Sequence, residues 1–180
     1  MFNHIANMRI ASSKTAAAIL LSLISATPVY SKPAGTTALE EWFKSVVPQI
    51  FPNSTTNWQA AFENGLLDPK IKAALNGRDF TSLAEMRGYW SAVSAQIASR
   101  TEYYITEPEA FAFATDPEGR SGYVIGAAKT SLKTKQGDVY TDGGSSAFVS
   151  VAWNTELQKR VITEWKEVNT PPNYPNYPWS

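Results

Sequence analysis

The apolar residues of this chain change their spacing once, near Thr101, and that change constrains the fold more than any other feature. Before Thr101 they recur at steps of three and four, as on one face of a helix, and after it they alternate, as in half-buried strands. A helical half followed by a strand-rich half predicts an α+β fold in which a curved sheet wraps round its own helices. Such a shape normally encloses a pocket, so the order of elements points to the handling of a small molecule.

The first 31 residues have the pattern of a secretory signal peptide. The basic residues Arg9 and Lys14 precede the short apolar run 15–26, and small residues ending at Ser31 form a cleavage site before Lys32. A membrane anchor is the alternative, but it needs about 20 consecutive apolar residues, and this run is shorter. The sequence therefore predicts a secreted or periplasmic protein that has no membrane association after cleavage.

Composition excludes several kinds of chemistry in the remaining chain, which at about 149 residues is the size of one domain. The chain has no Cys, and its one His, His4, lies in the leader. Catalytic triads built on His, zinc sites built on His or Cys, and thiol redox chemistry are therefore excluded, and we expect no metal and no cofactor. Two of the 16 basic residues and none of the 16 acidic residues lie in the leader, so the mature chain has a net charge of −2 and no basic patch for nucleic acid.

Local signals set the expected helices. After a flexible segment over residues 32–36, a first helix should begin at Thr37 as its N-cap and end or kink at Pro48. A second, short helix is expected over 57–64. The third and longest helix should follow the capping box that Ser82 opens, with its apolar stripe continuing to residue 97.

Turn signals set the expected strands. A small hairpin should form around the dipeptide Asn76-Gly77, which suits a type I′ turn. Four longer strands are expected at 101–113 (with an interruption at Pro108), 122–134, 146–153 and 160–169. The segment 170–180 is rich in Pro and aromatic residues, and it fits either a ligand for a proline-recognition domain or a strap over the apolar mouth or the sheet edge.

The last expected strand carries the most informative residues. Val161, Thr163, Trp165, Glu167 and Asn169 alternate onto one face. A core strand rarely turns a carboxylate and an amide inward, because an unpaired buried polar group costs about 1–3 kcal/mol. A pocket wall tolerates both groups. The alternative is that Glu167 and Asn169 lie in water beyond the edge of the sheet.

Short helices, the Asn-Gly hairpin, a long capped helix and long strands that close on Trp-Lys-Glu-Val-Asn (165–169) together resemble the NTF2-like superfamily, particularly its SnoaL-like branch, over residues 37–169. The resemblance implies a cone formed by a strongly curved, mostly antiparallel sheet around about three helices, with a pocket inside. It also implies either a cyclase, isomerase, dehydratase or hydrolase that needs no cofactor, or a member that only binds. The Asp–His pair often used by these enzymes has no counterpart here, because the mature chain has no His. Asn169 corresponds to the polar residue that ends the last strand in many members.

Three functional hypotheses follow. In the first, the protein is a lyase or isomerase of a polyketide-like or terpenoid-like molecule. Glu167 is then the general acid or base, with a pKa raised by burial against Trp165, while Tyr103 polarises a carbonyl or enol oxygen. In the second, the same pocket binds a small hydrophobic ligand without catalysis. In the third, the tail or the outer face of the sheet docks a partner, and a homodimer through the sheet is one such arrangement. The expected ligand contacts, shared by the first two hypotheses, are Trp90, Trp153, Thr163, Trp165 and Asn169.

Overall fold

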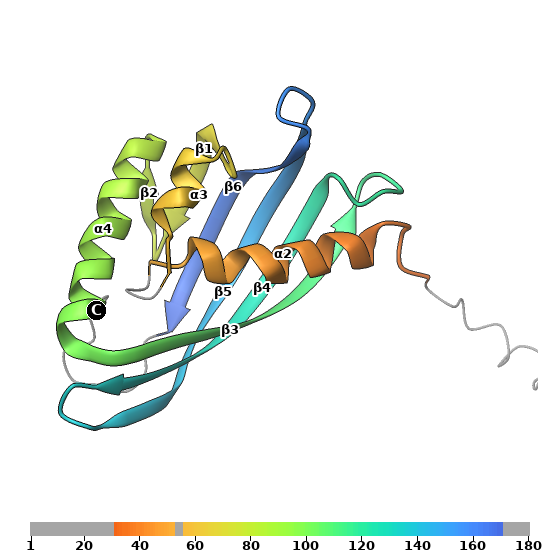
Figure 1. The fold of residues 1–180 in the computed structure, drawn as a ribbon. Helices are drawn as coiled ribbons and strands as arrows, with labels where there is room; N and C mark the ends of the chain where they lie inside the picture. Colours follow the sequence, from red (N-terminus) through yellow and green to blue (C-terminus); the bar gives the residue numbers. More distant parts are fainter. Residues whose placement is uncertain (1–30, 53–55, 171–180) are drawn as a thin grey trace, which may run out of the picture. The chain divides into compact units, whose positions relative to one another are not determined.

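The computed structural model describes residues 31–52 and 56–170. The predicted signal peptide up to residue 30, the sequence Asn53-Ser54-Thr55, which has the pattern of a glycosylation acceptor, and the tail from Pro171 lie outside these residues. Three helices and six strands follow one another along the described chain (Figure 1): α2 (Thr36–Ile50), α3 (Gln59–Glu63), β1 (Leu67–Leu75), β2 (Arg78–Phe80), α4 (Leu83–Arg100), β3 (Thr101–Ala114), β4 (Gly122–Thr134), β5 (Val139–Asn154) and β6 (Lys159–Thr170). This is the predicted order of a helical half and a strand-rich half.

All six strands belong to one sheet with the order β2-β1-β6-β5-β4-β3. The four long strands β3 to β6 form an antiparallel meander, and β1 joins it in parallel with β6. Figure 1 shows α2 crossing one face of the long strands and α4 standing beside β1 and β2 on the same face. A curved, mostly antiparallel sheet around three helices is the predicted α+β architecture, and this prediction is confirmed.

The turn between β1 and β2 and the start of α4 both form as local chemistry requires. Asn76 and Gly77 have φ angles of 50° and 78°, and positive φ at both positions is the condition for a type I′ turn. The Ser82 hydroxyl accepts a hydrogen bond from the Glu85 N–H at 3.1 Å, as an N-cap does. The Glu85 carboxylate, however, binds the N–H and the hydroxyl of Thr81, rather than the N–H of the cap residue itself.

Helix α2 corrects two expectations. Its N-cap is Gly35 and not Thr37, and the side chain of the neighbouring Thr36 accepts a hydrogen bond from the Ala114 N–H of β3 instead. Pro48 lies inside the helix, which continues to Ile50. A proline this close to the helix end removes a single backbone hydrogen bond, so the last turn still forms.

Two irregularities in the sheet matter for the site. Pro108 does not interrupt β3, because β3 is an edge strand in which a missing N–H breaks no ladder bond. In β6 the register with β5 shifts, so that Ser150 pairs with Glu164 while Val151 pairs with Ile162. Thr163 is the extra residue of this β-bulge, and the alternation of side chains predicted for the last strand is broken there.

The core under the helices forms two clusters. The larger contains most of the buried residues of α2, α3, β1 and the central strands, with Phe43 and Trp165 packed at a ring-centroid distance of 6.1 Å. The smaller lies between the end of α4 and the far ends of β3 and β4, and it includes Ile97, Tyr104 and Leu132. The candidate site described below draws its walls from both clusters.

The outer face of the sheet carries an apolar patch, formed by residues of β3, β4 and β5 that are 38–60% exposed: Phe111, Phe113, Tyr123, Ile125 and Phe148. Phe111 pairs with Ile125 and Ile125 with Phe148, so these residues are neighbours across three strands. No helix in the described part of the chain is both long enough and apolar enough to cross a membrane. Within residues 31–52 and 56–170, no three His, Cys, Asp or Glu side chains gather as a metal site would require.

Candidate functional site

A small, partly open space lies between the C-terminal half of α2 and the inner face of the sheet, and we call it the main chamber. It has a volume of about 30 Å³. Its lining combines side chains from α2, Trp90 of α4 and four strands: Phe43, Val47, Ile50, Phe51, Thr106, Pro108, Gly126, Ala127, Ala128, Ser145, Ala147, Trp165 and Glu167. The strands contribute mainly small residues here, and this is why the helix and the sheet leave a gap.

A second space of about 20 Å³, the side chamber, lies on the other side of Phe51 and Trp90. The two chambers share three residues, Phe51, Trp90 and Glu167, and the side chamber adds Tyr89 and Asn169 to its own wall. Each chamber holds only one or two water molecules, at about 10–15 Å³ per water. A ligand as large as an aromatic ring therefore requires Phe51 to move and the two chambers to join.

Glu167 is the carboxylate of the main chamber. Its side chain is buried, with 8% of the residue exposed, and its Oε2 accepts a hydrogen bond from the Trp165 Nε1–H at 2.8 Å. Burial raises the pKa of Glu167 above its ordinary value, and hydrogen bonds from Trp165 and Ser145 offset part of that rise. No ion pair with Glu167 occurs among the described residues, so burial dominates.

The fold holds Glu167 in place through the hairpin turn. The Asn76 N–H donates to the Glu167 carbonyl at 2.9 Å, and the Asn76 side-chain oxygen accepts from the Asn169 N–H at 2.7 Å. Both bonds join the β1–β2 turn to the end of β6. The turn dipeptide that was visible in the sequence thus fixes the backbone on either side of residue 168.

Four of the predicted site residues lie together at the chambers. Glu167 and Trp165 line the main chamber, and Asn169 lines the side chamber. Trp90 lines both, and its indole N–H donates to the Ile50 carbonyl at 2.8 Å, so that its ring offers an apolar wall while its polar atom is already bonded.

Three predicted residues lie elsewhere. Tyr103 is on the opposite face of β3 from the buried Tyr104, because strand alternation places successive residues on opposite faces. Thr163 lies at the bulge of β6 and lines a shallow depression on the outer face, together with Tyr123 and Glu164. These assignments of Tyr103 and Thr163 to the pocket were wrong.

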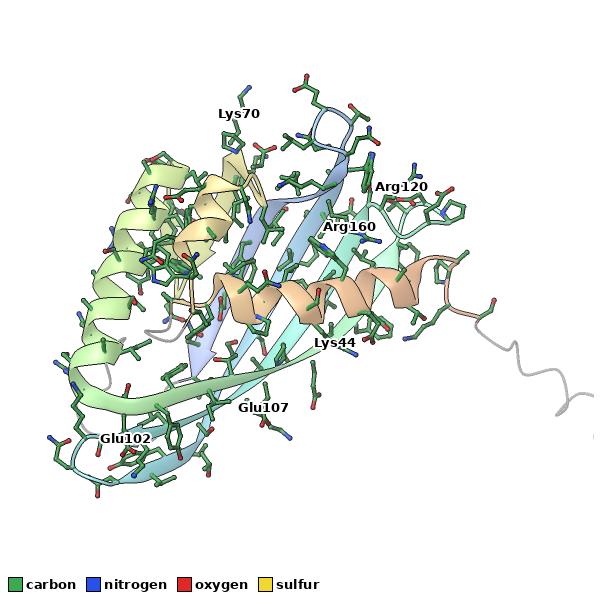
Figure 2. All side chains as sticks on the ribbon, viewed as in Figure 1. Lys44, Lys70, Glu102, Glu107, Arg120 and Arg160 are labelled. Carbon is green, nitrogen blue, oxygen red and sulfur yellow. The ribbon has the colours of Figure 1, made fainter. Side chains whose placement is uncertain are left out.

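Trp153 was also wrongly assigned, because it lies at the far end of β5. Its ring stacks under the Arg120 guanidinium at 5.0 Å, and its backbone N–H donates to the Ser121 hydroxyl at 3.0 Å. Figure 2 shows Arg120 and Arg160 at this end of the long strands and Glu102 at the other end. Arg160 bonds the Gly119 carbonyl at 2.7 Å and lies over the Trp42 ring, and these contacts close this end of the fold.

The sequence missed three polar residues of the chambers. Tyr89 lines the side chamber, and burial raises its pKa, with a smaller contribution from the charge of Glu167, while Arg78 opposes the rise. Ser145 and Thr106 line the main chamber. The only sequence signal for Tyr89 was its position beside Trp90 on the long helix. Ser145 and Thr106 lie in segments where the sequence pattern did not show which side chains point toward the interior.

The chemical capacity of the chambers follows from these groups. Glu167 is the one carboxylate of the main chamber, and burial raises its pKa, as is common for carboxyl groups that donate a hydrogen bond or transfer a proton in a site. Tyr89 lines the side chamber together with Glu167, so that chamber holds a tyrosine as well as the carboxyl. Apart from Thr106, Ser145 and Asn169, the remaining walls are apolar, and they favour a ligand with a largely hydrocarbon body.

The chain matches no family model, and it matches no curated protein sequence. Its structure is similar to that of Aln2 from a Streptomyces species, with a TM-score of 0.55 and 10% identity over 77% of this chain and 94% of that one. It is also similar to nuclear transport factor 2 from Cryptosporidium parvum, with a TM-score of 0.51 and 11% identity over 78% and 98% of the two chains. A third similar structure, from Novosphingobium aromaticivorans, is named a putative aromatic ring hydroxylase, with a TM-score of 0.52 and 14% identity over 75% and 90%.

These similarities define the class of fold. The protein has the NTF2-like fold, as the order of its elements predicted. Identities of 10–14% establish the fold alone, so the activity has to be argued from the chambers themselves.

Proposed function

We propose that this protein is exported and binds a small, largely apolar molecule in the joined chambers, where Glu167 acts as general acid or base in an isomerisation, cyclisation or dehydration that needs no cofactor. The observation that carries the proposal is the buried carboxyl of Glu167, which faces an apolar cavity and has hydrogen bonds from Trp165 and Ser145 but no ion pair among the described residues. Perturbed carboxyl groups of this kind are characteristic of acid–base sites.

The proposed reaction is the transfer of a proton from one position of the bound molecule to another, with Glu167 as the carrier. As a carboxylate, Glu167 removes a proton from a carbon next to a carbonyl group, and as the resulting acid it returns that proton to another position. The proton count is unchanged, so no further reactant is needed for an isomerisation. Tyr89, on the side-chamber wall, supplies a hydrogen bond to the oxygen that gains negative charge during the transfer.

A non-catalytic binder is the second candidate, and one observation favours it. The main chamber has no titratable side chain besides Glu167 among the described residues, so an acid and a base on opposite sides of a substrate are not both available there. In this alternative Glu167, protonated by burial, serves only as a hydrogen-bond donor to the ligand. Docking of a partner to the outer face is compatible with either candidate.

The experiment that separates the two candidates begins with the ligand. Native mass spectrometry of protein purified from its own exporting host identifies the bound molecule, and turnover of that molecule is then measured with the wild type and with Glu167→Gln. If the protein is an enzyme, turnover falls about 10²–10⁴-fold while affinity changes little, because the amide keeps the shape and hydrogen bonding of the carboxyl. Glu164→Gln is the matched control, since Glu164 lies on the same strand and lines the outer depression.

If the wild type binds the molecule without converting it, the binder proposal holds. If Glu164→Gln and Glu167→Gln reduce turnover equally, Glu167 has no special role and the proposed site is wrong. A wild-type protein that carries and binds no small molecule contradicts both candidates.

A further inference from the structure

Thr106 carries a buried hydroxyl with no partner. Its Oγ1 is the one buried side-chain polar atom of the described residues that has no hydrogen bond. Such a group destabilises the folded protein, and in native structures an unpaired buried group usually has a reason, such as a ligand or an ordered water. Thr106 lines the main chamber, so the partner that it lacks can be supplied from inside that chamber.

The position of Thr106 relative to Glu167 sets the geometry of recognition. Thr106 is on β3 and Glu167 is on β6, with β4 and β5 between them in the sheet. Through Ala147 and Gly126, Glu167 is in register with Ala110 of β3, so Thr106 lies three strands across and four residues along the sheet from Glu167. These offsets are about 14 Å across the strands and about 13 Å along them, and the curvature of the sheet shortens the direct path. Between the two strands, the chamber wall is formed by small residues: Gly126, Ala127, Ala128, Ser145 and Ala147. Ser145 is the polar residue among them, and its side chain is hydrogen-bonded to Glu167.

We propose that Thr106 is a second polar anchor, and that the ligand is an elongated, flat apolar molecule with one oxygen group at each end. One oxygen binds the Glu167 carboxyl and the other binds the Thr106 hydroxyl, while the hydrocarbon body lies over the small residues between them. This inference rests on the proposed function, because it takes the chambers as the ligand site. It adds a residue that determines specificity and a class of ligand.

A water molecule is the other partner that Thr106 can have. The main chamber holds about two waters, and one of them at Thr106 satisfies the hydroxyl in the free protein. A ligand oxygen that displaces this water restores the bond, whereas a methyl group that displaces it leaves the hydroxyl unpaired. The protein therefore discriminates between an oxygen and a methyl group at this end of the ligand.

Three matched probes test the inference by calorimetric titration: 4,4′-biphenol, 4-hydroxy-4′-methylbiphenyl and 4,4′-dimethylbiphenyl. In the wild type, we expect the two-hydroxyl probe to bind about 5–10-fold more tightly than the one-hydroxyl probe, which is the net worth of one hydrogen bond. Thr106→Val has nearly the same shape but no hydroxyl. It should reduce the ratio of the two affinities to about one, while the affinity for the one-hydroxyl probe stays within about two-fold of the wild-type value.

Unfolding in urea provides a second measurement that needs no ligand. Thr106→Val should leave the midpoint unchanged or raise it, because it removes an unpaired hydroxyl. Thr101→Val is the matched control on the same strand, since the Thr101 hydroxyl donates to the Ile97 carbonyl at 2.8 Å and its loss should lower the midpoint. A Thr106→Val midpoint lowered as much as that of Thr101→Val shows that the hydroxyl has a structural partner and overturns the inference.

The outcomes separate this inference from the proposed function. If the one-hydroxyl probe binds more tightly than the dimethyl probe but the two-hydroxyl probe gains nothing further, the Glu167 anchor stands and the Thr106 anchor is refuted. If the wild type binds none of the three probes, the ligand site itself is wrong, and the inference fails with it. A ratio that stays at 5–10-fold in Thr106→Val places the second oxygen elsewhere and also refutes the assignment.

Discussion

Glu167→Gln should change how the stability of this protein depends on pH. The carboxyl has a pKa raised above 4.5 in the folded protein, mainly because burial disfavours its charged form. The folded protein therefore binds the Glu167 proton more tightly than the unfolded chain does. The stabilisation that results is fully present below pH 4.5, and it is lost as the pH rises from 4.5 through the folded-state pKa.

The magnitude follows from linkage. Between the two pKa values the folded protein holds one proton more than the unfolded chain, so the free energy of unfolding falls by about 1.4 kcal/mol for each pH unit. The buried position of Glu167 means that solvent does not screen this effect appreciably. A glutamine at position 167 accepts the Trp165 hydrogen bond but does not titrate. The free energy of unfolding of the variant therefore does not fall with pH on account of this residue. The difference in free energy of unfolding between the wild type and Glu167→Gln should change by about 1.4 kcal/mol for each pH unit between the two pKa values. Above the folded-state pKa of Glu167, this difference should become constant.

Urea unfolding at half-unit steps from pH 4 to pH 8 measures this difference. Other titrating groups act equally in both proteins and cancel. Tyr89, which shares the side chamber with Glu167, has a pKa raised further above its usual 10 and is neutral throughout this range. Glu164→Gln is the control, because the pH dependence of stability that Glu164 contributes has the opposite sign. A hydrogen bond from Lys166 lowers the pKa of Glu164, so its contribution is lost as the pH falls below 4.5. Parallel curves for the wild type and Glu167→Gln would show that Glu167 is ionised and solvated, and would refute the site.

The remaining predictions address the chambers, the outer face and the leader. Phe51→Ala should join the two chambers, lowering stability by about 1–3 kcal/mol but tightening the binding of 4,4′-biphenol, measured by calorimetry. Gly126→Ala should weaken that binding and cost about 1–3 kcal/mol in urea unfolding, because its methyl group would lie 2.9 Å from the Phe43 ring. Ile125→Glu should convert a homodimer to a monomer in analytical ultracentrifugation, and a monomeric wild type would contradict the dimer through the sheet. Amino-terminal sequencing of exported protein should begin at Lys32, whereas material that begins at Met1 would refute signal cleavage.

Local chemistry was sufficient for most elements of this fold. Asn76-Gly77 specified a turn because both residues tolerate positive φ, and Ser82 specified a helix start because its hydroxyl can satisfy a free N–H. The change of apolar spacing near Thr101 correctly placed the four long strands after the three helices, since burial of one face requires one period in a helix and another in a strand. Alternation also placed Trp165 and Glu167 together, and both line the main chamber.

The class of fold, the order of its elements and the placement of Trp165 and Glu167 on one face of the last strand could be predicted from the sequence, because they depend on residues close together in the chain. Only the tertiary structure decided the register between strands. The bulge at Thr163 arises in the pairing of β6 with β5, and it turns that residue to the outer face although the local pattern is regular. Likewise, Thr106 and Tyr89 reach the chambers because a curved sheet and a packed helix bring distant residues to one cavity, and no local spacing records which of them meet.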